Sequence, residues 1–412
     1  MTDFDSDFNC DVAIIGSGPA GIGAATALAE RGVKNITIFE REEHIGGIPR
    51  HTKHLTFGLV AFKRPMTGPA FIKKILARCK NVTIRTNISV IAIKQDSTFE
   101  VATAQGLQTV KAKHIILATG ARESTRHARL VSGMRPRGIV STAALQQFIY
   151  SFGARPFNQA VVVGTELVSF SAIWTLWRAK IKPVAMIERN HRITAYRPAV
   201  LLAKILRVPI YYNSQITNIE SINTLKAVSI MSDSGVKQVL NCDGIIFSGK
   251  FVGENSLAVA SHLLLNPQTD IPFIDENWQT SDSDVTVIGN AVHPADMGDQ
   301  CYLEGLKLGS FLADKLAQNT VNSAEFIPIE HSSDIKMTTP NMVRLDNETS
   351  KTINICFHVS KIYWGLVTVK FAGKTVYKKR HRCMPARRIT LKNIRLDPFD
   401  INDKTSIEIC FS

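Results

Sequence analysis

The sequence lacks several features that would place it among membrane, secreted or metal-binding proteins. No apolar run reaches the roughly 18 residues that a helix needs to cross a bilayer. The first twelve residues, MTDFDSDFNCDV, are acidic and contain neither the basic nor the apolar segment of a secretory signal. The 7 cysteines are scattered and never form a CxxC pair, which argues against a zinc site or an iron–sulfur cluster. We therefore expect a cytoplasmic chain with reduced thiols, no metal site and no transmembrane segment.

The composition is that of a globular chain with an uneven positive charge. Its 412 residues correspond to two or three domains, and the 45% hydrophobic content is enough for sizeable cores. The formal net charge is +14, and residues 334–412 carry 15 Lys and Arg against 7 Asp and Glu. No acidic residue occurs between Glu348 and Asp397. Such an excess is typical of chains that bind nucleic acid, an anionic surface or an acidic protein.

Residues 10–40 have the pattern of a strand, a glycine turn, a helix and a second strand. The turn reads Gly16-x-Gly18-x-x-Gly21, and Glu40 ends the second strand. In a dinucleotide site the first glycine forms the tight turn, the second admits a pyrophosphate, and the third lets the helix pack on the strand. Glu40 would accept hydrogen bonds from the ribose hydroxyls, and the helix N-terminus would attract the phosphates. The alternative is a glycine-rich turn that binds no ligand.

A second strand–turn–helix–strand pattern begins near residue 159, but its turn departs from the glycine fingerprint. Gly164 matches the first glycine, whereas Glu166 and Ser169 stand where further glycines are expected. A carboxylate would repel a pyrophosphate, so we predict a degenerate nicotinamide site and leave NAD(P) binding uncertain. Glu188 at the next strand end could still bind a ribose. The alternative is that the Glu166 side chain swings aside.

The domain organisation follows from these patterns. We expect an α/β fold in which the second dinucleotide-binding region is inserted into the first. Short strands are expected at 82–86, 90–94, 98–103, 109–112 and 114–117, a return strand near 285, and a helix from about 301 to 317. Beyond residue 334 only strand patterns occur, with Ala372-Gly373 as a two-residue hairpin turn, which indicates a small antiparallel all-β domain. The predicted boundaries are 1–154 and 271–330 for the FAD-binding domain, 155–270 for the inserted domain and 334–412 for the β-domain.

Three further motifs resemble those of a known protein family. Gly46-Gly47 follows Glu40, Ala118-Thr119-Gly120 follows the short strands, and Gly289-Asn290 follows the return strand. At these points the chain resembles the flavoprotein superfamily with two dinucleotide-binding, Rossmann-like domains, which includes the pyridine nucleotide–disulfide oxidoreductases. The resemblance implies a glutathione reductase-like arrangement and FAD as cofactor. It implies that Val90 holds the adenine through its backbone and that Asn290, where the superfamily usually has Asp, binds the ribityl chain. The implied cofactor-binding set is Gly16, Gly18, Pro19, Ala20, Gly21, Glu40, Gly47, Val90, Ala118, Thr119, Gly120, Gly289 and Asn290.

A narrower resemblance concerns two loops. Gly46-Gly-Ile-Pro-Arg50-His51 with His54, and the segment around Gly164, are similar to opine oxidase alpha subunits and hydrogen cyanide synthase subunits. That branch consists of flavin dehydrogenases that act on amines or amino acids beside partner subunits. The iron–sulfur cysteines of some of these relatives are absent from this sequence.

The candidate catalytic groups are histidines rather than thiols. Residues 41–60 contain no cysteine, so the redox dithiol of disulfide reductases is missing, and the lone Cys301 is expected to be a packing residue. His51, His54 and His293 could take a proton from a substrate ammonium because imidazole titrates near neutral pH. Arg50 could bind a substrate carboxylate. The alternative for His51 and His54 is that they are solvated loop residues.

These observations predict an FAD-dependent oxidoreductase, specifically a dehydrogenase of a small amine, amino acid or opine, or hydroxy acid. Its electrons would pass to a partner protein or a quinone. One alternative is an NAD(P)H-dependent flavoprotein reductase, and another is an FAD-bearing non-catalytic subunit that binds a partner through its basic tail. The stretch from Lys374 to Arg382 is either a solvated edge strand or a docking face for a partner subunit or electron acceptor. Nucleic acid is a less favoured partner because no nucleic-acid motif surrounds these residues.

Overall fold

The computed structural model describes residues 9–221, 223–318, 325–345, 350–385, 387–397 and 406–411. The chain divides into two compact units. The first unit is Met1–Gly47, Ile72–Ala121 and Gly253–Ser412, and the second is Ile48–Phe71 with Arg122–Val252. The chain thus leaves the first unit and returns to it, which confirms the expected insertion. It passes between the units through the paired strands β7 (Ala121–Glu123) and β16 (Phe251–Gly253), and through residues 47–48 and 71–72.

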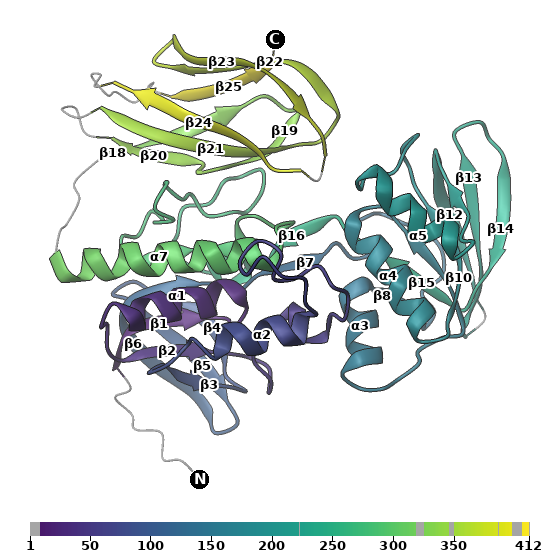
Figure 1. Cartoon of the computed structure of the whole chain (residues 1–412), viewed down its shortest axis with the longest axis horizontal. Helices are drawn as coiled ribbons and strands as arrows, with labels where there is room; N and C mark the ends of the chain where they lie inside the picture. Colours follow the sequence, from purple (N-terminus) through teal and green to yellow (C-terminus); the bar gives the residue numbers. More distant parts are fainter. Residues whose placement is uncertain are drawn as a thin grey trace. The chain divides into compact units, whose positions relative to one another are not determined.

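The first unit contains a seven-stranded sheet (Figure 1). Its strands are β1 (Asn9–Ile15), β2 (Ile36–Phe39), β3 (Thr83–Arg85), β4 (Ser89–Ile93), β5 (Thr98–Thr103), β6 (Gly106–Leu117) and β17 (Val285–Val287). The order is β3-β2-β1-β6-β5-β4, with β17 also on β6. The two strands expected at 109–112 and 114–117 are one long strand, β6, because it changes partners along its length. Its first half pairs antiparallel with β5, and its second half pairs parallel with β1 and β17.

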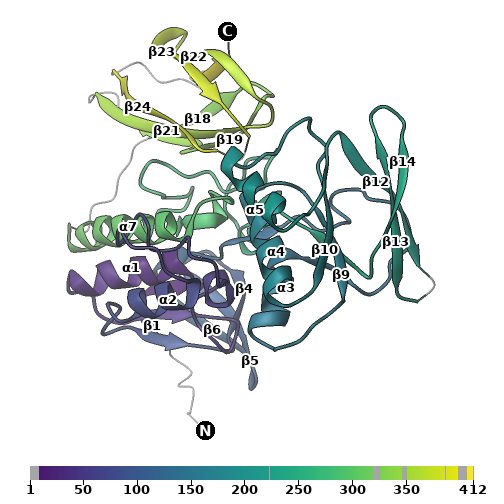
Figure 2. The same ribbon diagram turned by 45° about the vertical axis from the view of Figure 1, so that its right-hand side comes forward.

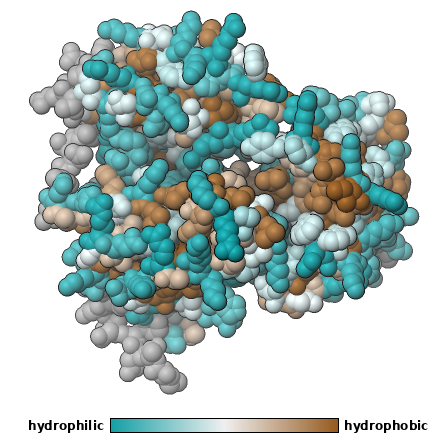
Figure 3. All heavy atoms as spheres, in the orientation of Figure 1, coloured by the Kyte–Doolittle hydropathy of each residue, from teal (hydrophilic) through white to brown (hydrophobic). Residues whose placement is uncertain are grey.

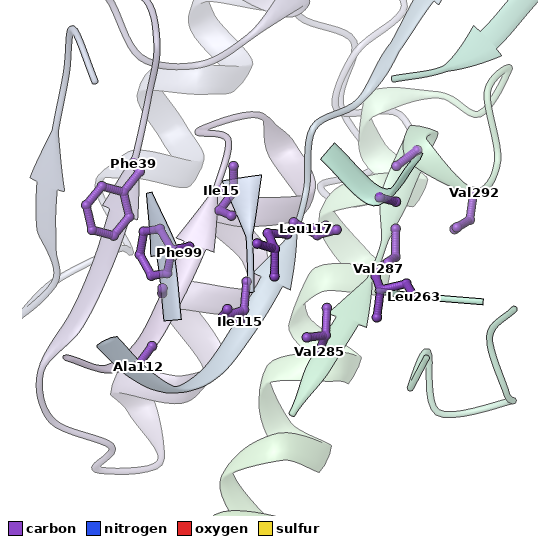
Figure 4. Close-up of a cluster of buried hydrophobic side chains, with 14 of the residues drawn as sticks. Ile15, Phe39, Phe99, Ala112, Ile115, Leu117, Leu263, Val285, Val287 and Val292 are labelled. Atoms are coloured by element: carbon purple, nitrogen blue, oxygen red, sulfur yellow. The ribbon is translucent and has the colours of Figure 1, made fainter. Parts of the chain in front are cut away.

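Both faces of this sheet are covered. Helices α1 (Pro19–Glu30) and α7 (Gly298–Gln318) cover one face. The two helices approach each other closely because α7 has glycines at the contact, where a Cβ on Gly305 or Gly309 would clash with the Ala20 or Ala24 backbone. Figure 4 shows the core on the other face, to which β1, β2, β5, β6 and β17 contribute, together with Leu263 and Val292. Helices α2 (Gly68–Leu76) and α6 (Ser256–Val259) complete the helical elements near this sheet. The parallel strands β1, β2, β6 and β17 end at the same edge of the sheet.

The second unit contains a parallel sheet of order β11-β10-β9-β15-β8. Its strands are β8 (Ile139–Ser141), β9 (Gln159–Val163), β10 (Lys182–Ile187), β11 (Ile210–Tyr211) and β15 (Gly244–Phe247). One face packs against α3 (Thr142–Tyr150), α4 (Leu167–Arg178) and α5 (Val200–Ile205) (Figure 2). The other face packs against the antiparallel strands β12 (Ser214–Ser221), β13 (Leu225–Ser232) and β14 (Lys237–Asn241).

The C-terminal segment forms two sheets that share one hydrophobic core. The orders are β20-β18-β25-β22-β23 and β19-β21-β24, and the strands are β18 (Glu325–His331), β19 (Ile335–Thr339), β20 (Met342–Leu345), β21 (Lys351–Val359), β22 (Tyr363–Phe371), β23 (Lys374–Cys383), β24 (Ile389–Leu396) and β25 (Ile407–Phe411). Because β18 belongs to these sheets, the β-domain begins before the expected residue 334. It is also not purely antiparallel, since β18 pairs parallel with β25. Ala372 and Gly373 have φ values of 48° and 75°, which confirms the predicted hairpin turn between β22 and β23.

The surface of the described residues is mixed in character. No helix among them is both long enough and apolar enough to span a bilayer. Figure 3 shows mainly hydrophilic side chains over the C-terminal sheets and a hydrophobic patch around α5, where Leu201 and Ile205 are exposed.

Candidate active site

The first dinucleotide loop, Gly16–Gly21, connects β1 to α1 and has the geometry that the sequence predicted. Gly16 has a φ of +109°, and a Cβ there would clash with the Ala118 carbonyl oxygen, so the position requires glycine. A Cβ on Gly21 would clash with the Gly16 carbonyl oxygen, which confirms its packing role. Gly18 differs from both. Its φ is −69°, and no atom lies within 4 Å of an added Cβ.

The space over Gly18 leaves room for a ligand, and neither its φ nor a clash requires glycine at this position. Gly18 is the N-cap of α1, so the space lies where the helix presents unpaired N–H groups and a partial positive charge. Pro19 and Ala20 form the first turn of this helix. The loop therefore fits an anionic group such as the pyrophosphate of FAD, and the residues present satisfy the requirements of such a group.

Glu40 is fixed beside this loop. It follows β2, is buried, and accepts hydrogen bonds from the Ser17 backbone N–H at 3.0 Å and from the Ser17 hydroxyl. Its other carboxylate oxygen accepts from the Glu42 N–H at 3.0 Å. Such anchoring holds the carboxylate in one orientation at the carboxyl edge of the sheet, where it can accept further hydrogen bonds from ribose hydroxyls.

The remaining predicted cofactor residues gather at the same edge. The Gly46 N–H donates to the Ser17 carbonyl at 3.1 Å, and a Cβ on Gly47 would touch the Gly18 Cα. Ala118 bonds to β1, and Thr119 and Gly120 bond to the backbone of Glu254.

The last two cofactor segments of the prediction contain Gly289 and Val90. Gly289, with a φ of +67°, packs against Ala20. Val90 lies on β4, two residues after Ile88, whose N–H donates to the Glu40 carbonyl oxygen. The structure thus brings the predicted set together, while the role of each residue toward FAD stays a prediction.

Asn290 has a specific local function that its sequence position did not reveal. Its amide nitrogen donates to the Asp296 carbonyl oxygen at 3.1 Å, and its amide oxygen accepts from the Asp296 N–H at 3.1 Å. An aspartate could accept the second bond but could not donate the first. Asparagine at this position therefore closes the loop 290–296, which explains the departure from the usual Asp.

The second dinucleotide loop, Gly164–Ser169, reproduces the first except where a ligand would approach. Gly164 has a φ of +115°, and the Thr165 hydroxyl donates to Glu188 as the Ser17 hydroxyl donates to Glu40. The Asn190 N–H donates to the other oxygen of Glu188 at 2.9 Å. Glu166 is the N-cap of α4, with a φ of −69°, so it occupies the position of Gly18.

The Glu166 carboxylate has a fixed position beside Gly249 and Lys250. It accepts a hydrogen bond from the Lys250 N–H at 2.9 Å and lies against Gly249, where a Cβ would overlap it. Arg129 and Lys250 supply positive charge near it. Ser169 is fully buried, and its hydroxyl has no hydrogen-bond partner among the described residues.

His51 and His54 lie in the second unit, in the segment that follows Gly47. His51 ends a 3-10 helix (Ile48–His51), and it is buried with neither ring nitrogen hydrogen-bonded to a described residue. Burial, together with Arg50, lowers its pKa to about 4. Burial likewise lowers the pKa of His54 to about 4, and its Nδ1 lies 2.7 Å from the Thr56 hydroxyl. The alternative that both are solvated loop residues does not fit His51, because its ring is buried and neither ring nitrogen has a partner among the described residues.

His293 lies in the first unit, in the loop that Asn290 closes. Its Nε2 is 3.5 Å from the Glu304 carboxylate, and its Nδ1 has no partner among the described residues. Burial alone would raise the pKa of Glu304, but His293, Arg388 and the Trp278 hydrogen bond together lower it. Cys301 is buried beside this loop, and burial raises its pKa well above the usual value, which is consistent with the expected packing role.

Several site residues escaped the sequence analysis. Ser17 and Thr165 follow the first glycine of each loop and anchor a Glu placed 23 residues later. This equal spacing in the two loops is visible in the sequence and could have predicted both anchoring residues. Asp296, Glu304 and Arg388 belong to no local sequence pattern. Arg388 in particular meets Asp296 from a distant part of the chain.

Comparison with known proteins gives a consistent result. The family model described as pyridine nucleotide-disulphide oxidoreductase matches residues 10–318. A soluble pyridine nucleotide transhydrogenase from Pseudomonas fluorescens (strain Pf0-1) is 22% identical over 363 residues, covering 76% of this chain and 73% of that protein. An opine oxidase subunit from Rhizobium meliloti is 26% identical over 157 residues, covering 38% of this chain and 33% of its own. The crystal structure of T. acidophilum thioredoxin reductase matches with a TM-score of 0.63 and 20% identity, covering 76% of this chain and 100% of that one.

Proposed function

This chain belongs to the pyridine nucleotide-disulphide oxidoreductase family of flavin-dependent, FAD-binding oxidoreductases, and we propose that it is a dehydrogenase of small C–N or C–O substrates. The substrate classes are amines, amino acids or opines, and hydroxy acids. Electrons leave to a partner protein or a quinone. The resemblance to an opine oxidase subunit supports both the substrate class and the use of a partner.

The observation that carries this proposal is the contrast between Gly18 and Glu166. The space over Gly18 is open, whereas the equivalent place in the second dinucleotide loop holds a carboxylate bonded to the Lys250 N–H. A pyrophosphate at the second loop would have to displace that anion and would be repelled by it. This favours a donor other than NADH or NADPH.

The thiols support the same conclusion. All seven cysteines, each within the described residues, are free. A disulfide reductase needs two neighbouring thiols of low pKa, whereas burial raises the pKa of Cys10 and of Cys242 to about 12. Reduction of a disulfide substrate by this chain is therefore disfavoured.

His51 is the best candidate for contact with the substrate. The flavin, when bound, accepts a hydride, and the protein has to bind the donor and handle its proton. With a pKa of about 4, His51 is neutral at neutral pH, so its free ring nitrogen can accept a hydrogen bond from a substrate N–H or O–H. His54, His293 and Arg50 remain proposals for the same task. The low pKa makes His51 a weaker base than its residue type suggested.

One observation favours the NAD(P)H-dependent reductase as a second candidate. The Thr165–Glu188 pair reproduces the Ser17–Glu40 pair, so the carboxylate that would bind a nicotinamide ribose is still oriented. A nucleotide that reorients Glu166 could therefore use this anchor.

An anaerobic screen separates the two candidates. Amines, amino acids, opines and hydroxy acids are mixed individually with the oxidised protein, and loss of flavin absorbance near 450 nm is followed by stopped flow, on the order of 1 s⁻¹ or faster for a true donor. NADH and NADPH are tested in parallel. We expect bleaching by a member of the first group and slow bleaching by the nicotinamides. Rapid reduction by a nicotinamide, with none of the other donors active, would establish the reductase instead.

A further inference from the structure

The C-terminal sheets are held against the rest of the first unit by basic side chains that pair with largely buried acids. Arg344 bonds to Asp275 at 3.2 Å, Lys351 pairs with Glu276, and Arg388 pairs with Asp296. In each case the acid belongs to the dinucleotide-binding part and the base to the C-terminal segment. Part of the positive charge of the tail is therefore neutralised within the chain itself.

One of these ion pairs reaches the predicted cofactor site. Asp296 is the residue whose backbone N–H and carbonyl bond to the Asn290 amide, and its side chain is only 6% exposed. Met297, the next residue, precedes α7, whose first turn begins at Gly298. Arg388 immediately precedes β24 in the C-terminal segment, so its position is set by the β-sandwich.

The same loop has a second anchor. His293 faces Glu304 of α7, and Glu304 also accepts a hydrogen bond from the Trp278 indole at 2.5 Å. His293 and Arg388 both lie within electrostatic reach of the buried His358 of β21. Segment 289–297 is therefore held from both sides, by α7 and by the C-terminal sheets.

We propose that the C-terminal β-domain clamps the FAD-binding return segment, with Arg388 as the positioning residue that fixes Asp296 and, through it, Asn290. The proposal rests on the assignment of Gly289 and Asn290 to the FAD site. Without Arg388, the Asp296 carboxylate would lose its ion-pair partner and keep only the weaker influence of His293, so the loop would open toward water to solvate it. The Asn290 amide would then lose its fixed orientation, and so would the start of α7.

The test measures how fast FAD leaves the holoenzyme. Arg388→Met removes the charge and keeps most of the side-chain stem, and the rise of free-flavin fluorescence after dilution reports release. We expect release about tenfold faster than in the unaltered protein, the effect of losing one ion pair on a largely buried carboxylate. Arg388→Lys should restore part of the difference. The matched control is Lys351→Met, which breaks the ion pair with Glu276 but leaves the loop anchored.

A second measurement separates positioning from general loosening of the domain. If both variants lower the melting temperature but only Arg388→Met accelerates release, the clamp is confirmed. Asp296→Asn in the Arg388→Met background should then add little, because the pair acts as a unit. Equal release rates in Arg388→Met and Lys351→Met would overturn the proposal. Retention of flavin by Gly18→Val would show instead that the FAD assignment itself is wrong.

Discussion

Gly16 and Gly164 stand at the same point of two similar loops, with φ values of +109° and +115°, yet two residues later one loop has glycine and the other glutamate. Gly18 and Glu166 have the same φ of −69°, so the backbone does not distinguish them. The two loops therefore separate what the fold requires from what a ligand requires. The fold requires the first glycine in both, and only a bound pyrophosphate requires the second.

The third position shows a further difference. Gly21 allows α1 to approach the Gly16 carbonyl, whereas the second loop has the buried Ser169 at this place. The hydroxyl of Ser169 lacks a partner among the described residues, which costs free energy. The first loop is therefore adapted to a ligand and to close packing, and the second retains mainly the turn and its anchored acid.

The largest expected effect comes from adding a side chain at Gly18. Gly18→Val fills the open space over the loop, so the purified protein should be colourless while remaining folded. The matched control is Gly16→Ala, which should destabilise folding by on the order of 3 kcal/mol, because it combines a positive φ with a clash against Ala118. Flavin absorbance and thermal melting measure the two effects. A yellow Gly18→Val protein would contradict the assignment of this loop.

The sequence predicted the geometry of the first loop well because its requirements are local. The roles of Gly16, Gly21 and Glu40 are defined by a segment of about 30 residues, and the order of glycine, helix and acid leaves few alternatives. The bounds of β5 and the hairpin at Ala372-Gly373 were predicted correctly for the same reason.

Other features could not be predicted because they depend on distant contacts. The continuity of β6 requires knowledge of its three partners, and helix α3 was not expected at all. The early start of the β-domain at β18 depends on pairing with β25, some 80 residues later. The lowered pKa of His51 and the pairing of Arg388 with Asp296 depend on burial and on tertiary contacts that residue type does not encode.

The next effect concerns the second loop. Glu166→Gly removes the carboxylate from the place that a pyrophosphate would take, so reduction of the flavin by NADH or NADPH should rise at least about tenfold, given the cost of opposing charges at close range. Glu166→Gln keeps the size and removes the charge, which separates repulsion from steric blocking. Stopped-flow absorbance gives both rates. If neither variant responds, another part of the second unit prevents binding.

The two parallel sheets are also expected to differ in how their stability depends on pH. His114 lies on β6 in the first sheet, where burial, with a smaller contribution from Lys315, lowers its pKa to about 3, whereas β15 at the corresponding place is entirely apolar. The folded pKa lies below the unfolded value of about 6.5. The stabilising contribution of neutral His114 is therefore complete above pH 6.5 and is lost as the pH falls toward 3.

Thermal melting between pH 7.5 and pH 4 measures this effect. We expect the melting temperature to fall below about pH 6.5, with a smaller fall in His114→Val. His51, His54 and His358 also have pKa values lowered to about 4, so the variant should retain part of the dependence. An identical pH dependence in His114→Val would show that His114 is not among the groups responsible.

The smallest expected effect concerns the basic residues of the β-domain, some of which form ion pairs within the chain while others lie exposed on an edge strand. Arg344, Lys351 and Arg388 pair with acids of the dinucleotide-binding part, whereas Lys378, Arg380 and Arg382 lie on β23, at the edge of the five-stranded sheet. These three residues pair across to Thr368, Leu366 and Trp364, so they share the outer face of the sheet. Trp364 is 70% exposed, and the Arg382 guanidinium lies 5.8 Å from its ring centre.

Such a face suits an acidic partner, because an exposed tryptophan and arginine supply contact area while the neighbouring charges steer the encounter. Reversing Lys378, Lys379, Arg380 and Arg382 to glutamate should leave the flavin content and its reduction by substrate unchanged. Turnover with the physiological electron acceptor should fall severalfold at low ionic strength and less at high salt, where attraction is screened. The control reverses Lys361, an exposed base outside β23. If turnover is equal in both variants at every salt concentration, β23 serves as a solvated edge whose charges prevent strand-to-strand association.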